Sequence, residues 1–466
     1  MRRTLEVAWT ICLAIALTGC EPYGLTTEYR TDPVGIDCVA PRLSWKLPDG
    51  IARQTAYELE LDGAAQGRIE SAETLNRPWT GGKLETGSRH AWRVRIWDEN
   101  DRVTDWSEPA SFTMGVMREA DWKAEWLGRP KAPAQAFERR FVLKGPVRRA
   151  TLFITAAGFY EAWLNGRRIG DKVLDPSPTQ FDKRILYSTY LLDGDLQEGE
   201  NVLRVLVGHG WYDVRAQADW NFNRAPWRDF PRMLAQLELE YEDGGCETIT
   251  SDQEWTVASS PVLHDDIREG EIVRSHDACP DAGSGAKTAP APAGARLVAE
   301  AHPATKVIAE MRPEKVVRLG DGSWMVCFPV NLAGWIRLRV SGQERDSVVA
   351  VRYDERVNDD LTPALPTWLY GRRVTPPPGK DVRKIDAHMH FPSSHHVLPD
   401  GGAFQTDRII CSGEDETYEP RFTYNGFRYV WISGWKGELR PEDVTGCVVA
   451  TSFARTVRFE SSDPVL

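Results

Sequence analysis

The chain has 466 residues, 41% of them hydrophobic, and a formal net charge of −11 at pH 7. This length predicts about two to four domains with packed cores. The acidic balance argues against nucleic acid and against anionic membrane surfaces as binding partners.

The first twenty residues have the features of an export signal. Two arginines precede an apolar run, Val7–Leu17, that is too short to span a bilayer and is typical of a signal peptide. The run leads into a segment, Leu17-Thr18-Gly19-Cys20, that resembles a bacterial lipobox, in which the cysteine is acylated. We therefore predict a lipoprotein signal peptide over 1–20, lipidation at Cys20, and an outer-membrane location, on the periplasmic or surface side, through a lipid anchor only. The alternative is an ordinary signal peptide with a chance cysteine.

Residues 21–116 predict a small all-β domain. Apolar and charged residues alternate over Tyr57–Asp62 and over Trp92–Ile96, which is the pattern of half-exposed strands. A cluster of turn residues, Asp98–Asp101, separates the second of these strands from the segment Trp-Ser-Glu-Pro that begins at Trp106.

A second all-β domain is predicted over 117–281. Leu152 and Ile154 alternate with their neighbours, and Asn165-Gly166 supplies the positive φ angles of a tight hairpin. The nearly continuous apolar run Val202–Val207 predicts a strand buried on both faces. The pattern indicates a β-sandwich, and the loops at its ends are the places where such folds commonly bind ligands.

The rest of the chain continues the all-β pattern. We predict a linker rich in small residues and proline over 282–302 and another sandwich over 303–456, with a long insert over 356–405. No segment of the mature chain has the apolar periodicity of a long helix.

Several long motifs resemble the N-terminal part of bacterial α-L-rhamnosidases. They are Trp-Ser-Glu-Pro from Trp106, Ile154–Asp171, Tyr187–Tyr190, Gly199–Asp213, Asn331–Gly342 and Tyr418–Gly434. The resemblance implies three consecutive β-sandwiches, a fibronectin-III-like one and two jelly-roll-like ones. In the family a run similar to Phe459–Leu466 leads into the α/α barrel that performs hydrolysis, so residues 457–466 are expected to be a truncated lead into a barrel that is absent here.

The resemblance also implies that the central sandwich can bind rhamnose, with calcium nearby. The loops concerned surround the Asn-Gly hairpin and follow the Gly-Trp-Tyr segment. The candidate sugar-binding residues are Asn165, Gly166, Trp211, Tyr212, Trp220 and Trp227. For each ring, packing in the core is the more common role. No cofactor is required, and calcium in the central sandwich is the only one that the resemblance allows.

Histidines gather within the predicted insert. His388 and His390 form an His-x-His pair, and His395 and His396 follow closely, so four imidazoles could take up a transition metal. A solvated loop without a functional metal is the preferred interpretation, and no metal ligand is assigned. The six cysteines after Cys20 are widely scattered, which permits disulfides or free thiols equally.

Glycoside hydrolysis needs two carboxylates about one bond, and the resemblance places both in the barrel, so no catalytic residue is assigned. We expect a non-catalytic part of an α-L-rhamnosidase-like protein that binds or positions rhamnose-containing glycans and is inactive alone. The alternatives are the front half of a split rhamnosidase that works with a separately encoded barrel, and a purely structural interaction module. An amidohydrolase, suggested by the His-x-His pair alone, is a distant fourth.

Overall fold

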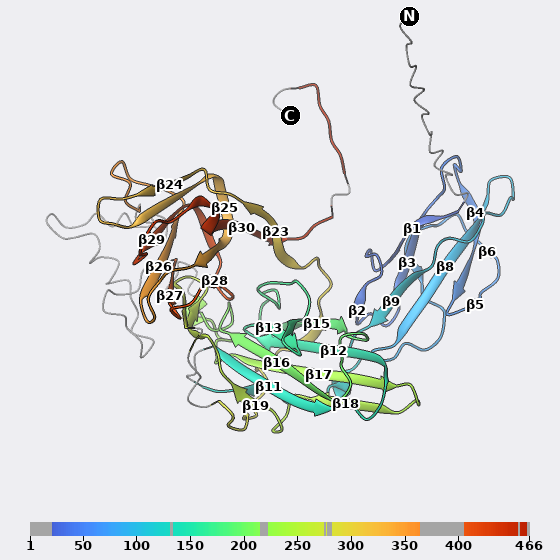
Figure 1. The fold of residues 1–466 in the computed structure, drawn as a ribbon. Helices are drawn as coiled ribbons and strands as arrows, with labels where there is room; N and C mark the ends of the chain where they lie inside the picture. The colour runs from blue at the N-terminus through green and yellow to red at the C-terminus, as the bar shows by residue number, and fades with distance from the viewer. Residues whose placement is uncertain are drawn as a thin grey trace, which may run out of the picture. The chain divides into compact units, whose positions relative to one another are not determined.

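The structure is a computed structural model that describes residues 21–130, 134–214, 222–274, 276, 282–363, 405–454 and 457–463. The chain divides into two compact units, of which the first ends at Met117 and the second begins at Arg118. Strands and short 3₁₀ turns make up the regular structure of the described residues, with no α-helix among them (Figure 1). The predicted all-β class is confirmed. Among the described residues there is therefore no helix that is long and apolar enough to cross a membrane.

The first unit is a sandwich of a 3-stranded and a 6-stranded sheet. Its strands are β1 (Tyr23–Thr27), β2 (Val34–Ile36), β3 (Arg42–Lys46), β4 (Gln54–Leu61), β5 (Ala64–Ala65), β6 (Ile69–Glu70), β7 (Arg77–Pro78), β8 (Arg89–Asp98) and β9 (Ala110–Met114).

The predicted alternation decides which side chains fill this first core. In β8, Trp92, Val94 and Ile96 are at most 1% exposed, whereas Arg93 and Arg95 between them stay partly exposed. The two arginines lie over the ring of Trp106, at 5.0 and 4.7 Å from its centre. The Trp-Ser-Glu-Pro segment therefore packs on the outer face of the sheet, against the cations of β8.

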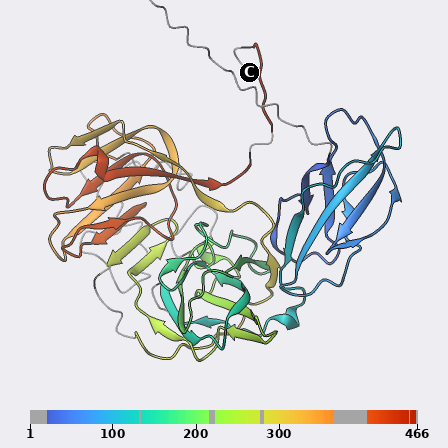
Figure 2. The same cartoon turned by 45° about the vertical axis from the view of Figure 1, so that its right-hand side comes forward.

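The second unit begins with the central sandwich, which has a 6-stranded and a 5-stranded sheet. In Figure 2 the blue-green and green strands of these sheets lie in two layers. The 6-stranded sheet contains β10 (Leu127–Gly128), β12 (Val147–Ala157), β15 (Arg184–Leu191), β17 (Arg232–Tyr241), β18 (Cys246–Thr250) and β22 (Arg296–Ala299). The 5-stranded sheet has the order β14 (Arg167–Arg168), β13 (Phe159–Leu164), β16 (Glu200–Gly208), β11 (Gln135–Val142) and β19 (Thr256–Ala258). Two 3₁₀ turns, η1 (Glu119–Asp121) and η2 (Phe222–Arg224), lie outside the sheets.

The third sandwich is formed around a 10-stranded sheet. Its elements are β20 (Val262–Asp266), β21 (Gly270–Arg274), β23 (Thr305–Met311), β24 (Lys315–Arg318), β25 (Trp324–Val340), β26 (Val348–Asp354), β27 (Thr406–Ile410), β28 (Glu416–Tyr418), β29 (Asn425–Ser433), η4 (Pro441–Asp443) and β30 (Val444–Thr451).

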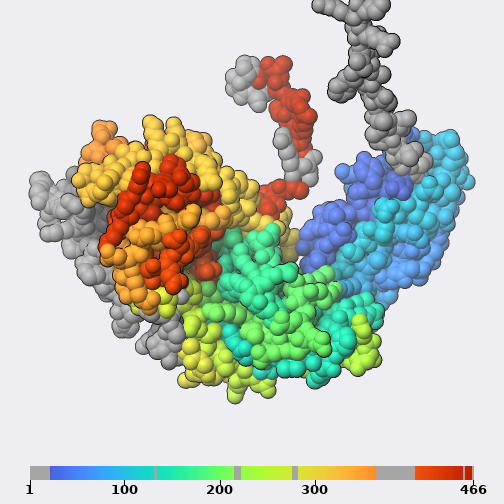
Figure 3. Space-filling model, viewed as in Figure 1, coloured from blue at the N-terminus to red at the C-terminus, as the bar shows by residue number. Residues whose placement is uncertain are grey.

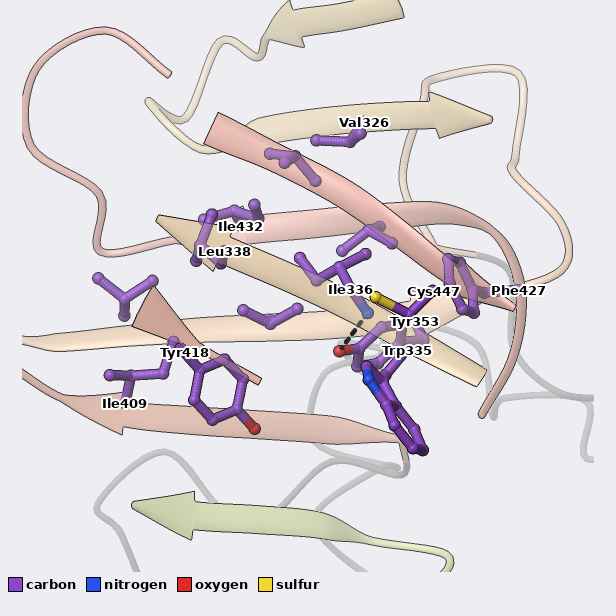
Figure 4. Close-up of a cluster of buried hydrophobic side chains, with 14 of the residues drawn as sticks. Val326, Trp335, Ile336, Leu338, Tyr353, Ile409, Tyr418, Phe427, Ile432 and Cys447 are labelled. Atoms are coloured by element: carbon purple, nitrogen blue, oxygen red, sulfur yellow. Dashed lines mark hydrogen bonds between the residues drawn. The ribbon is translucent and has the colours of Figure 1, made fainter. Parts of the chain in front are cut away.

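Strand β25 holds the third sandwich together because it pairs with β24, β28, β29 and β30 along its 17 residues. Figure 3 shows the consequence, since yellow and orange parts of the surface lie beside red parts that follow much later in the chain. The core cluster includes Ile336, whose backbone N–H donates to the Tyr353 hydroxyl at 3.4 Å (Figure 4). Trp335 also belongs to this cluster, and its indole N–H donates to Glu419 at 2.9 Å.

Two segments pair with strands of sheets to which the sequence analysis did not assign them. The predicted linker 282–302 contributes β22, which runs parallel to β15, and Ala286 is buried in the central core. Short side chains and prolines allow a strand of this kind at a sheet edge, so composition alone does not distinguish it from a linker. The hairpin β20–β21, which the prediction assigned to the central domain, pairs in parallel with β27 of the third sheet.

Gly158 lets the chain pass from one central sheet to the other between β12 and β13. Its φ angle is +129°, and a Cβ there would lie 2.3 Å from the carbonyl oxygen of Gly208. We expect Gly158→Ala to lower the free energy of unfolding by at least about 2 kcal/mol, because backbone strain and a clash add. The control Gly145→Ala, at a position with open space, should change it by less than about 0.5 kcal/mol. Equal midpoints in chemical denaturation for the two variants would contradict this account.

Candidate functional site

The outer face of the 5-stranded central sheet is apolar and buried at one end of its strands and polar or half-buried at the other. Inward-facing residues such as Tyr160 and Leu164 belong to the central core. Of the outward-facing residues, Phe159 and Leu206 are buried in a separate apolar cluster with Phe422 of the third sandwich. Farther along the strands, the outward residues are polar or half-buried. The third sandwich thus covers one end of this face and leaves a cleft at the other end.

We call this opening the Trp163 cleft. It has a volume of about 370 Å³ and is lined by β13 and β14 on one side and by β23, β25 and residues 417–421 on the other. Pockets that bind small molecules commonly measure roughly 300–1,000 Å³. The indole of Trp163 is half-buried on the sheet side, so part of the ring remains open to the cleft.

Glu161 is the central anion of the Trp163 cleft. Its carboxylate forms an ion pair with Arg168 at 2.9 Å and accepts from the guanidinium group of Arg421 at 2.7 Å, and the Glu161 side chain is only 9% exposed. Burial lowers the pKa of Arg421, but the neighbouring Glu161, Glu271 and Tyr418 together raise it by more, so the pKa is raised and Arg421 remains a cation. The same guanidinium lies 5.8 Å from the centre of the Trp163 ring. Two arginines and one carboxylate therefore hold the rim of the cleft next to the indole.

The opposite wall carries a second set of charges. Glu419 accepts from the indole N–H of Trp335 at 2.9 Å and from Arg337 at 2.6 Å. The hydrogen bond to Glu419 is the main cause that raises the pKa of Arg337. Lys306 of β23 reaches Asp171, which follows β14, at 2.7 Å and so connects the two walls.

This arrangement suits a polyhydroxylated ligand. An aromatic face can contact the C–H face of a sugar ring, and hydrogen bonds between hydroxyls and ionised side chains are stronger than neutral ones. The paired charges are also fixed in place before a ligand arrives, which lowers the entropy that binding costs.

The predicted residue Asn165 has a structural role in the hairpin. It adopts a φ of +52°, its amide donates to Asn201 at 2.8 Å, and its amide oxygen accepts the Val202 N–H at 2.8 Å. These bonds connect the turn to the first residues of β16. Gly166 is exposed and lines a neighbouring cavity.

The aromatic residues predicted for the same loop end lie elsewhere. Trp211 and Tyr212 follow the last residue of β16, whereas Asn165 pairs with its beginning, so about 20 Å of strand separates them. Although the hairpin with Asn165 and the Trp211–Tyr212 segment both adjoin β16 in the chain, the fold does not bring them together. The reason is that the two ends of one strand point to opposite ends of a sandwich.

The three described rings of the aromatic group pack against protein. Tyr212 is 2% exposed, and Trp227 packs with it and with Phe181. Burial is the main cause that raises the pKa of Tyr212 to about 12. Trp211 is partly buried, 5.3 Å from the ring of Phe222 and under the guanidinium of Arg268 at 5.3 Å. The sugar-binding role of these rings stays a prediction.

Other predicted features lie outside the described residues. They are Cys20 with its lipid anchor, Trp220, and the histidines His388, His390, His395 and His396. Within the part of the chain that the structure describes, no group of three or more His, Cys, Asp or Glu side chains could hold a metal ion. Calcium in the central sandwich stays a prediction.

The residues of the Trp163 cleft were missed from the sequence. A usable signal was present in β13, where Glu161 and Trp163 alternate with the core residues Tyr160, Ala162 and Leu164. A tryptophan on the outward face of a strand is a candidate contact residue. The opposite wall gave no such signal, because Arg421 follows Glu161 by 260 positions.

A pair of buried carboxyl groups lies away from this cleft. Glu271 and Asp407 are both 0% exposed, and the Glu271 N–H donates to Asp407 at 3.0 Å. The Glu271 carboxyl group accepts the Arg421 N–H at 3.1 Å and the Tyr418 hydroxyl at 3.2 Å. Burial and then the charge of Asp407 raise the pKa of Glu271 to about 8, and burial raises the pKa of Asp407 to about 6. Neither residue lines the Trp163 cleft.

Three family profiles match this chain. The profile for the Rha78A-like, N-terminal immunoglobulin domain matches residues 22–118, that for the α-L-rhamnosidase N-terminal domain matches 145–308, and that for the bacterial α-L-rhamnosidase concanavalin-like domain matches 317–450. The chain is made of α-L-rhamnosidase N-terminal domains. These are non-catalytic domains of the family, and the helical barrel is absent from the described residues.

Curated relatives and solved structures agree with this assignment to the rhamnosidase N-terminal domains. An α-L-rhamnosidase of Streptomyces avermitilis is 32% identical over 95% of this chain and 58% of its own length, and one of Formosa agariphila is 28% identical over 93% and 48%. The structure of the α-L-rhamnosidase from Dictyoglumus thermophilum is 29% identical, with a TM-score of 0.77 over 92% of this chain and 48% of its own. The chain spans about half the length of the curated relatives that it matches.

The S. avermitilis enzyme complexed with L-rhamnose gives a TM-score of 0.80 over 96% of this chain and 59% of its own, at 22% identity, which shows the fold alone. The domain profiles also refine the prediction for residues 21–116, because the first domain matches an immunoglobulin domain. Fibronectin-III-like and immunoglobulin domains share the sandwich architecture.

The Glu271–Asp407 pair predicts how stability depends on pH. Both pKa values are raised, so the folded chain keeps protons that the unfolded chain has already released. The contribution of this pair to stability is therefore fully present at or below about pH 4, falls as the pH rises towards 8, and is lost above it. The slope between pH 6 and 8 should contain up to about 1.4 kcal/mol per pH unit from Glu271.

Glu271→Gln should remove this contribution, since glutamine is neutral at every pH. Chemical denaturation at pH 6, 7 and 8 measures the slope, and the exposed Glu242→Gln serves as control. A wild-type slope that Glu271→Gln leaves unchanged would show that the carboxyl group titrates normally.

Proposed function

We propose that this chain binds rhamnose-containing glycans in the Trp163 cleft and positions them for hydrolysis. The observation that carries the proposal is the open indole of Trp163 beside the Glu161–Arg421 pair, in a cleft of about 370 Å³. The family supports the ligand class, since the relatives are α-L-rhamnosidases and one related structure contains L-rhamnose.

The charges of the cleft favour a neutral sugar over a strongly charged ligand. Glu161, Asp171 and Glu419 each form an ion pair with a cation of the same cleft. A ligand that carried a large charge of either sign would have to compete with one of these pairs. Hydroxyl groups can instead donate to the carboxylates and accept from the guanidinium groups without separating them.

Trp163→Ala should weaken the binding of L-rhamnose at least about tenfold, because the variant loses the ring surface of the site. Isothermal titration calorimetry on the full chain measures the change. The wild-type affinity is expected to be millimolar, about −4 kcal/mol, as suits one shallow contact. Trp106→Ala is the matched control, since Trp106 is also half-buried under arginine.

Asn165→Ala separates this site from the hairpin site predicted by resemblance. It should lower stability by about 1 kcal/mol for each lost hydrogen bond and leave binding unchanged. Loss of binding in Asn165→Ala, together with full binding in Trp163→Ala, would move the sugar site to the hairpin. Titrations with and without calcium test the predicted cofactor in the same experiment.

We also propose that the isolated chain does not cleave rhamnosides and that activity needs a catalytic barrel. Hydrolysis needs a general acid that holds a proton beside the glycosidic oxygen. Glu161 is held between two guanidinium groups, and Glu419 accepts from Arg337 and Trp335. Glu271 and Asp407, whose pKa values are raised, are both fully buried.

The chain alone should release no nitrophenol from a nitrophenyl α-L-rhamnoside above the rate of buffer. Turnover of about 1 per second or faster by the pure chain would contradict the proposal. Activity that appears only when a separate barrel protein is added would support the split-enzyme alternative. The lipid anchor at Cys20 stays a prediction.

A further inference from the structure

The outward residues of the central sheet form a row that crosses its strands. Cross-strand pairing places Arg168 of β14 beside Trp163 of β13, Trp163 beside Arg204 of β16, and Arg204 beside Glu138 of β11. These pairs share one face of the sheet. With strands about 4.8 Å apart, the row extends over roughly 14 Å, which is longer than one sugar ring.

Cavities lie on both sides of Trp163 along this row. The Trp163 cleft contains the Arg168 end, and a second cavity, also of about 370 Å³, contains Arg204 and Glu138. We call the second one the Arg204 cavity. Trp163 and Arg421 line both. One indole therefore forms a common wall between two spaces of equal size.

The Arg204 cavity has the surfaces of a sugar site. Val202, Leu206 and Pro261 supply apolar contacts, and Gly166 leaves space at the rim. Arg204 donates to the carbonyl oxygen of Ser259, and no carboxylate among the described residues forms an ion pair with it. Since a guanidinium group has five N–H donors, most of them remain available for hydroxyl oxygens.

We propose that the two cavities are consecutive parts of one groove that binds the interior of a glycan chain. The glycan crosses Trp163 and places at least one residue in each cavity. This inference rests on the proposed function, and it adds that the ligand is an oligosaccharide rather than a single terminal sugar. A site for one sugar would need only one of the cavities, and the row of outward side chains would not continue past Trp163.

The experiment titrates the full chain with α-linked rhamno-oligosaccharides of one to four residues, by calorimetry. The association constant should rise at least about tenfold from one to three residues, because contacts in the second cavity add to those in the first. Arg204→Ala should remove this rise and leave the affinity for the monosaccharide unchanged. Trp163→Ala should weaken binding at every length.

Arg148→Ala is the matched control, because Arg148 is an exposed arginine on β12 of the other central sheet. It should keep the full dependence on chain length. If Arg204→Ala fails to fold, Glu138→Ala at the far end of the groove replaces it, and it should reduce the affinity for three and four residues only.

The outcomes separate the two proposals. Equal affinity for one and for four residues would overturn the groove and leave the glycan-binding function in place. A length dependence that Arg204→Ala and Glu138→Ala both retain would also overturn it, since the added contacts would lie elsewhere. Absence of binding at every length would overturn the proposed function itself.

Discussion

The packing of the third sandwich on the outer face of the central 5-stranded sheet is the constraint on which the second unit depends. Gly208 allows it, because a Cβ there would lie 2.3 Å from the ring of Phe422 and 2.9 Å from the Asp265 carboxylate. Phe422 thus sits directly on the backbone of β16. The neighbouring residue, Arg421, is held by the same contact at the edge of the Trp163 cleft. Close packing at one end of the sheet therefore positions the charges at the other.

Buried polar groups make this contact specific. Asp265 is 0% exposed and accepts both the backbone N–H of His209 at 2.6 Å and its imidazole at 2.8 Å. Glu271, one hairpin turn away, accepts from the backbone of the loop that carries Arg421. A buried carboxyl group without such partners would cost several kcal/mol, so these bonds strongly disfavour other ways of docking the two sandwiches. The hairpin β20–β21 carries both groups, which explains why it pairs with the third sheet.

The relatives extend well beyond the aligned region, and the glycan binding that we propose for the cleft requires no hydrolytic residues. Function belongs to sites and not to folds, and the proposed site lies where two sandwiches meet. A cleft between domains also permits a larger ligand than the end of a single sandwich does, since both walls contribute side chains. The ion pairs within it keep its net charge low, which fits a ligand made of hydroxyl groups.

The sequence by itself determined the all-β class, the family and the tight hairpin at Asn165-Gly166. Alternation in β8 and in β13 shows which side chains enter each core, because a strand repeats every two residues and its burial is encoded locally. The same alternation separates Glu161 and Trp163 from the core of their own sandwich. The alternation does not say whether another domain covers these residues. Phe159 and Trp163 are both aromatic residues on the outward face of β13, so the sequence cannot tell the covered one from the one that borders the cleft.

Only the tertiary structure decided where the cleft lies. Gly208 is covered by Phe422, whereas Arg204, four residues earlier on the same face, borders an open cavity. It also decided that Asn165 and Trp211 lie at opposite ends of β16 and that residues 296–299 form a strand instead of a linker. The physical reason is distance along the chain. Local periodicity shows which side chains of a strand face the core of its own sandwich, whereas the contact between Glu161 and Arg421 joins residues 260 positions apart.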